Sequence, residues 1–221
     1  MSSWSKVMVG VLLLGVAGAA CTRSEPTPSG ASAQQSAPAL AKVDPRKRGK
    51  ELVTLGGCND CHTPMKLDPA LGMPVPQMDR MLSGHPEGAP DPEGAPGKTD
   101  QGVIGSTFTA FKLPFGVVYA ANLTPDPETG LRMSEDEFVK AMRTGKHQGK
   151  ADGRPILPPM PWMNLAQAPE EDLRAIHAFL RTIPPVKNRV PEPRVPAPAI
   201  AEIAKSYAKM GEHAAPVPSP M

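Results

Sequence analysis

The sequence predicts an all-α fold with long, irregular loops rich in glycine and proline. Three segments carry helix signals, at about residues 44–56, 134–145 and 169–182, whereas residues 63–119 show no strong period. The chain has 29 prolines and 20 glycines among its 221 residues, a composition typical of long irregular segments. Aromatic residues make up only 4%, so the apolar core formed by side chains alone is expected to be modest.

Each of the three helices has a recognisable start. Asp44 is a good N-cap residue, and Pro45 suits the first helical position. Ser134 and Glu137 have the spacing of a capping box before a short amphipathic helix. Pro169 precedes a run of acidic residues that complements the positive end of a helix dipole.

The N-terminus has the pattern of an export signal. Lys6 precedes an apolar run at 7–20 that is too short to span a bilayer comfortably. Cys21 follows small residues and resembles the lipidated cysteine of bacterial lipoproteins, although Gly18 stands where that pattern usually has Leu. We therefore expect an exported protein on the periplasmic face, lipid-anchored to a bacterial membrane. The alternative is ordinary cleavage, which would leave a soluble periplasmic protein.

Composition then divides the chain into four parts. We expect a signal peptide at 1–20, the lipid anchor site and a disordered linker at 21–43, a folded domain at 44–186, and a proline-rich extension at 187–221. Within the extension a weak helix is expected near 199–210. The net charge of +2 gives no reason to expect a nucleic-acid partner.

The motif with the clearest chemistry is Cys58-Asn59-Asp60-Cys61-His62, which fits C-x-x-C-H, the attachment signature of haem c. Two thiols at this spacing can each bond one haem vinyl group, and the adjacent imidazole is then placed to bind the iron. A large apolar cofactor would also organise a chain with so many loops. In bacteria this attachment occurs outside the cytoplasm, in agreement with the export signal. The sequence thus predicts one covalent haem c, bonded to Cys58 and Cys61, with His62 as an iron ligand.

Three other uses of Cys58 and Cys61 are weaker. A thioredoxin-type pair lies at a strand-to-helix turn, but here the motif follows a helix. A zinc site needs more ligands, and no second cysteine pair is present. A disulfide alone does not explain His62.

The second axial ligand is predicted to be Met160. Prolines precede and follow it, and we expect them to hold the backbone extended and stiff. Met163 is a near rival. The remaining candidates are less favoured: His147 is expected in a solvated loop and His177 on a helix surface, and four methionines lie in a long loop (Met65, Met73, Met78 and Met81).

Over residues 44–186 the order of these elements resembles class I cytochrome c. More narrowly, the segments 119–126, 138–145 and 154–162 resemble cytochrome subunits of alcohol-dehydrogenase type. This resemblance implies that His62 and Met160 are the axial pair. It also implies that Gly49 allows the N-terminal helix to cross the C-terminal helix closely, near Phe179.

Two features of this chain differ from the pattern of that family. Its members often contain two or three haems, whereas this chain has a single C-x-x-C-H motif and is expected to pass one electron at a time. The segment 66–118 also lengthens the interval between His62 and Met160. It is expected to wrap either the haem edge or a partner surface, and the sequence favours neither.

The predicted function is therefore single-electron transfer in a respiratory or dehydrogenase-linked chain, and the protein itself is not expected to be an enzyme. Expected partners are a dehydrogenase, an oxidase or another cytochrome, and the basic cluster 46–50 is a candidate docking site. A peroxidase or a haem sensor would need an open or displaceable distal site. Four residues are candidates for contacts with the haem or its propionates: Tyr119, Asn122, Arg154 and Trp162.

Overall fold

Three helices form the larger apolar core of the computed structural model, which describes residues 43–94 and 101–213. They are α1 (Pro45–Leu55), α3 (Glu135–Thr144) and α5 (Glu170–Leu180). The predicted caps of the first two are confirmed: the Asp44 side chain accepts from the Arg46 N–H, and Ser134 and Glu137 form a reciprocal capping box. The predicted signal peptide, Cys21 and the linker to residue 42 lie outside the described residues.

Helices α1 and α5 cross at very short range because Gly49 has no side chain. A Cβ atom there would lie 1.9 Å from the Ala175 carbonyl oxygen and 2.8 Å from the Phe179 Cβ. The expected close crossing near Phe179 is thus confirmed. We call the larger apolar core the first cluster. Its buried side chains come mainly from the three helices and include Val53, Phe138, Leu173, Ile176 and Leu180.

Shorter helices connect these elements. Helix α2 (Cys58–His62) begins after Gly57, whose φ of 64° turns the chain sharply out of α1. Two 3-10 turns, η1 (Met78–Arg80) and η2 (His147–Gly149), and helix α4 (Trp162–Leu165) follow. The last helix, α6 (Ala197–His213), is longer than the sequence predicts. Nowhere in the described ranges is a helix both long and apolar enough to cross a bilayer.

The prediction of an all-α, class I cytochrome c fold is wrong, because part of the segment between His62 and Met160 forms two antiparallel sheets. Strands β1 (Met65–Asp68) and β2 (Met73–Pro76) make a hairpin. Three further strands form the second sheet in the order β3-β4-β5: β3 (Val103–Ile104), β4 (Ala110–Leu113) and β5 (Gly116–Tyr119). These strands have two to four residues, too few for an alternating apolar pattern to be visible in the sequence.

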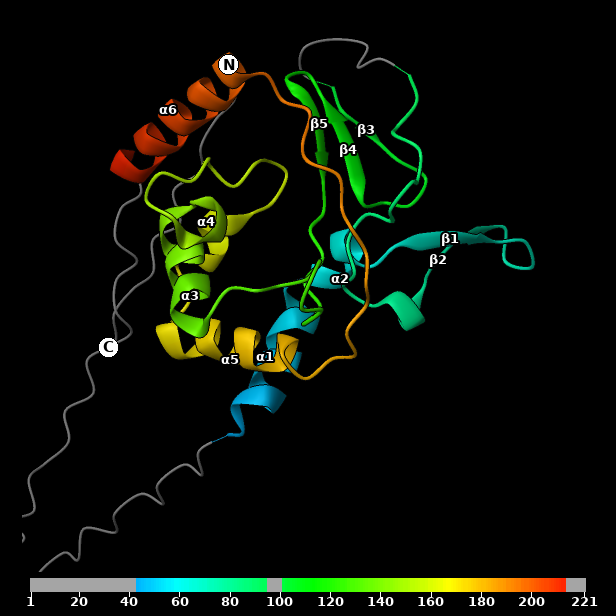
Figure 1. Ribbon diagram of the computed structural model, residues 1–221, viewed down its shortest axis with the longest axis horizontal. Coiled ribbons are helices and arrows are strands. Elements are labelled where there is room, and N and C mark those ends of the chain that lie inside the picture. Colours follow the sequence, from blue (N-terminus) through cyan, green and yellow to red (C-terminus); the bar gives the residue numbers. More distant parts are fainter. Residues whose placement is uncertain (1–42, 95–100, 214–221) are drawn as a thin grey trace, which may run out of the picture. The chain divides into compact units, whose positions relative to one another are not determined.

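A second, smaller apolar cluster lies against the three-stranded sheet. Its buried members are Phe111, Val118 and Leu157, and Cys61 and Ile203 are among the half-buried residues packed against it. After α5 the chain runs along β5 to α6, as Figure 1 shows in orange. We call this segment, residues 184–196, the strap.

Asn188 fastens the strap to the loop that precedes the second sheet. Its side chain is 1% exposed and donates to the carbonyl oxygens of Ser83 and His85, at 2.6 and 2.9 Å. Its Oδ1 accepts from the Glu87 N–H at 2.8 Å and from Arg80 at 3.2 Å. A single buried amide therefore joins the strap to three backbone groups of the loop and to the Arg80 side chain.

Candidate haem site

The His62 side chain in helix α2 is fixed by a hydrogen bond from one ring nitrogen to a backbone carbonyl. The side chain is buried, and its Nδ1 lies 2.8 Å from the carbonyl oxygen of Ala121. Because a carbonyl only accepts, Nδ1 carries the proton and Nε2 keeps its lone pair. Burial also lowers the pKa of His62, which favours the neutral imidazole that binds metals. The residue thus has both the protonation state and the supporting hydrogen bond of a haem ligand.

The two cysteines of α2 are free thiols that contact different apolar clusters. Cys58 packs against the first cluster and Cys61 against the second. Burial raises the pKa of both thiols, the reverse of the lowered pKa that activates a thioredoxin-type cysteine. Within the described residues no group of three or more His, Cys, Asp or Glu side chains is placed to hold a metal ion.

The loop containing Met160 touches the same two clusters. Met160 packs against the first cluster, as Cys58 does, and Leu157 belongs to the second, as Cys61 does. The backbone here is not extended as the sequence predicts. The N–H of Met160 donates to the Leu157 carbonyl oxygen at 3.3 Å, so Leu157–Met160 forms a turn. The assignment of Met160 as the second ligand stays a prediction.

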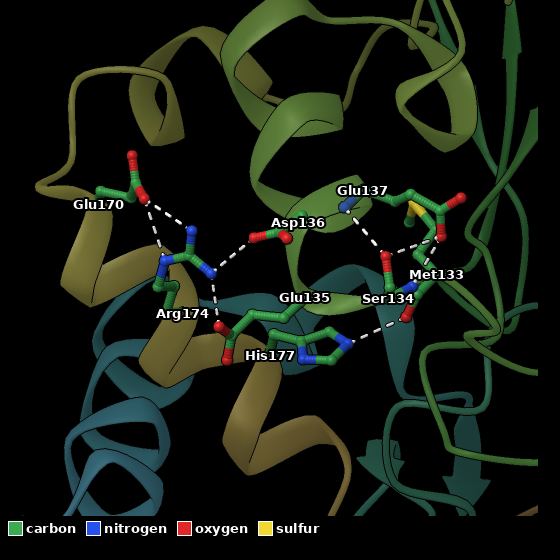
Figure 2. Close-up of polar contacts among 8 residues, drawn as sticks. All are labelled: Met133, Ser134, Glu135, Asp136, Glu137, Glu170, Arg174 and His177. Atoms are coloured by element: carbon green, nitrogen blue, oxygen red, sulfur yellow. Dashed lines mark hydrogen bonds and ion pairs between the residues drawn. The ribbon is translucent and has the colours of Figure 1, made fainter.

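The two histidines that were alternatives to Met160 as the second iron ligand have different surroundings. The prediction that His177 lies on a helix surface is wrong: it is buried, and its Nε2 donates to the Met133 carbonyl oxygen at 3.0 Å, as Figure 2 shows. That nitrogen is therefore not available to iron. His147 lies half-buried in η2. Of the loop methionines, Met73 and Met78 are more than half exposed, at 56% and 58%.

Figure 2 also shows a network of ion pairs that links α5 to α3. Arg174 of α5 pairs with Asp136 and Glu170 at 2.8 Å each, and also with Glu135. These acidic groups raise the pKa of Arg174. These side chains are largely exposed to solvent, so the ion pairs are expected to add little to the stability that apolar packing gives the two helices.

Two of the four predicted haem contacts, Tyr119 and Asn122, have hydrogen-bond partners within the protein, and their contact with haem stays a prediction. The Tyr119 hydroxyl donates to Asp91 at 2.6 Å. The Asn122 amide donates to the Val186 carbonyl oxygen at 2.9 Å, and its oxygen accepts from Thr124. Both side chains already have protein partners.

The other two, Arg154 and Trp162, flank Met160 on the chain. Burial lowers the pKa of the Arg154 guanidinium, whose one hydrogen bond in the described chain goes to the Pro155 carbonyl oxygen. Trp162 is buried, with its ring edge-on to Tyr207 at 5.3 Å between centroids. Arg154 thus has spare capacity for an anionic group, and its contact with haem stays a prediction.

The basic cluster at 46–50 is only partly available to a partner. Arg48 makes a two-pronged ion pair with Asp172 of α5, with both distances 2.9 Å, and Arg46 pairs with Asp44. Lys47 and Lys50 are exposed. Two of the four basic side chains are therefore already paired with carboxylates of the same chain.

Sequence reasoning missed the residues that cover the Cys61 side of α2. Phe111 and Val118 lie in strands that have no visible period, and Ile203 lies in a helix expected to be weak. Asn188 gave no signal at all, because nothing in a sequence marks an asparagine as buried. The one available signal was the spacing of apolar residues on one helix face at 199, 200, 203, 204 and 207, the positions that are half-buried in α6.

These features fit a covalently bound haem. Two thiols one helical turn apart face apolar surroundings, and the next residue is a buried, neutral imidazole held by a backbone carbonyl. No protein-family model matches the chain.

Individual relatives are nevertheless recognisable. A nicotinate dehydrogenase subunit of Pseudomonas putida is 30% identical over 66% of this chain, which corresponds to 9% of that protein. The cytochrome c subunit of a quinone alcohol dehydrogenase from Gluconobacter oxydans is 36% identical over 37% of the chain and 17% of its own length. The gluconate 2-dehydrogenase cytochrome c subunit of Pantoea cypripedii is 34% identical over 38% of the chain and 19% of its own. The chain thus spans less than a fifth of these relatives, and it is similar to cytochrome c subunits of dehydrogenases.

Proposed function

We propose that this protein is a single-electron carrier with one covalent haem c, working beside a dehydrogenase on the periplasmic side of a bacterial membrane. The observation behind the proposal is the Cys58–His62 helix, in which the Ala121 carbonyl fixes the buried imidazole. The similarity to dehydrogenase cytochrome c subunits supports the same conclusion. A bound haem supplies reversible one-electron chemistry at its iron.

The protein's own residues have distinct tasks in this proposal. Cys58 and Cys61 would bond the haem, and each is half-buried against a different apolar cluster. His62 would bind the iron through Nε2, and the Ala121 carbonyl would strengthen that nitrogen as a donor by accepting from Nδ1. Met160 would supply the second ligand to the iron. With both ligands from the protein, no site would be left for a substrate, which separates a carrier from a peroxidase or a gas sensor.

The first experiment compares Met160→Ala with Met163→Ala as its matched control. Each protein is produced with the haem-maturation machinery, and spectra of both oxidation states are recorded with and without carbon monoxide. Wild type and Met163→Ala should show the weak red-edge band of an oxidised iron–thioether bond and should ignore the gas. Met160→Ala should lose the band and bind it.

Other outcomes would replace parts of the proposal. If Met163→Ala alone loses the band, Met163 is the ligand. If wild type binds carbon monoxide readily, the distal site is open, and the enzyme or sensor hypothesis takes precedence. The mass of the protein must also increase by one haem and stay unchanged under denaturing conditions, because a thioether survives unfolding.

The membrane location is a separate part of the proposal and depends on Cys21. Replacing Cys21 with Ser in the full chain should move the protein from the membrane fraction to the soluble periplasmic fraction. Haem content should be unchanged. A wild-type protein that is already soluble would contradict the lipid anchor and leave the carrier function intact.

A further inference from the structure

The strap binds tightly to the edge of the three-stranded sheet. The Arg194 backbone exchanges two hydrogen bonds with Val117 of β5, at 2.8 and 3.1 Å. Gly116 makes this approach possible, since a Cβ atom there would lie 2.3 Å from the Arg194 carbonyl oxygen. An ion pair between Arg194 and Asp91 adds to the attachment. The sheet, the strap and the start of α6 are thereby joined.

Helix α6 then presents one half-buried face to residues on both sides of Met160. Ile203 packs against the second cluster, which contains Leu157. One helical turn further, Tyr207 meets the ring of Trp162. Leu157 and Trp162 lie three residues before and two residues after Met160, so α6 contacts the flanks of the predicted ligand.

The same second cluster receives Cys61, while Cys58 and Met160 pack against the first. A ring bonded to both sulfurs would therefore contact both clusters. We propose that β3–β5 and α6, held by the strap, form a second wall of the haem pocket on the Cys61 side. This inference rests on the proposed function and gives the C-terminal extension a part in the cofactor site.

The wall has a chemical consequence because it is apolar. Phe111, Val118 and Leu157 exclude water from that side, and Ile203 of α6 lies against them. A dry, apolar environment disfavours the extra positive charge of oxidised iron and so raises the reduction potential. It also limits the access of oxygen to the reduced protein.

The test introduces a neutral polar group on each face of α6. Ile203→Asn alters the half-buried face, and Ala208→Asn is the control on the exposed face of the same helix. With holoprotein we measure the reduction potential by redox titration and the rate at which oxygen reoxidises the reduced form. Ile203→Asn should shift the one-electron equilibrium toward the oxidised state by about three- to tenfold and speed reoxidation by a similar factor. Ala208→Asn should match wild type.

A purely structural role for α6 predicts a different result. Ile203→Asn would then lower the melting temperature while the potential and the reoxidation rate stay at wild-type values, which would overturn the second wall. If Ile203→Asn yields too little holoprotein, Ile203→Thr introduces a smaller polar group at the same place in the wall, and an unchanged potential and reoxidation rate there also refute the proposal. Failure of the carrier proposal is recognised separately, because wild type would then lack covalent haem.

Discussion

The helical core and the sheet-and-strap region of this molecule are held together in different ways. In the first, α1, α3 and α5 bury apolar stripes, and the close approach depends on one glycine, Gly49. In the second, the strands are short and the apolar cluster is small. The buried Asn188 amide and the backbone hydrogen bonds between Arg194 and Val117 attach the strap to this region. Apolar packing with helical period can be read from a sequence, whereas a polar junction made by one residue cannot.

The largest effect is expected from Gly49→Ala. The new methyl group would meet the Ala175 carbonyl at 1.9 Å, and backbone cannot move aside cheaply. We expect the free energy of unfolding to fall by at least about 3 kcal/mol, the upper range for overpacking. In an isolated helix, replacing glycine with alanine should instead stabilise the helix by about 1 kcal/mol. A loss of stability therefore indicates that the close helix crossing dominates, and a gain indicates that helix propensity dominates.

Denaturant unfolding of holoprotein measures this change, with Lys47→Ala on the exposed side of α1 as the control. Lys47→Ala should leave stability close to wild type. If Gly49→Ala is as stable as wild type, α1 and α5 can move apart without cost. The helical core would then not depend on the close approach at Gly49.

The next effect is expected from Asn188→Ala, which leaves two buried carbonyls and the Glu87 N–H without their partner. The free energy of unfolding should fall by about 2–3 kcal/mol, the cost of leaving buried polar groups unsatisfied. The exposed neighbour Arg189 provides the control as Arg189→Ala.

Hydrogen exchange would sharpen the comparison for Asn188→Ala. Faster exchange should be confined to the strap, the sheet and α6, with α1 and α5 still protected. Uniform acceleration across all helices would mean that the two regions unfold as one unit.

The smallest effect is expected at the start of α3. Ser134→Ala removes the capping hydroxyl, which should cost about 1 kcal/mol. Hydrogen bonds from the Ser134 backbone and side chain lower the pKa of Glu137. The stabilisation from this carboxylate is therefore full above its unfolded pKa, near 4.3, and is lost as the pH falls through the lower folded value.

Thermal unfolding at pH 7 and at pH 3 tests this cap. The difference between wild type and Ser134→Ala should be larger at pH 7 and should shrink in acid. A difference that grows as the pH falls would contradict the role of Glu137. The exposed Lys140→Ala in the same helix should show no such pH dependence.

The sequence by itself predicted the haem-attachment motif and determined the helical core. The C-x-x-C-H motif is local, since spacing alone places Cys58, Cys61 and His62 on one helical turn. The caps at Asp44 and Ser134 are local as well, and the apolar stripes of α1, α3 and α5 extend over several turns. The resemblance to known cytochromes added the crossing at Gly49.

Only the tertiary structure decided what surrounds that motif. Strands of two to four residues acquire their conformation from partners elsewhere in the chain, so the two sheets contradicted an all-α prediction. The burial of Asn188 and His177, and the contact of Ile203 with the second cluster, likewise depend on residues distant in sequence. Such contacts leave no local period or spacing in the sequence, because each involves a single side chain that meets a partner brought near by folding.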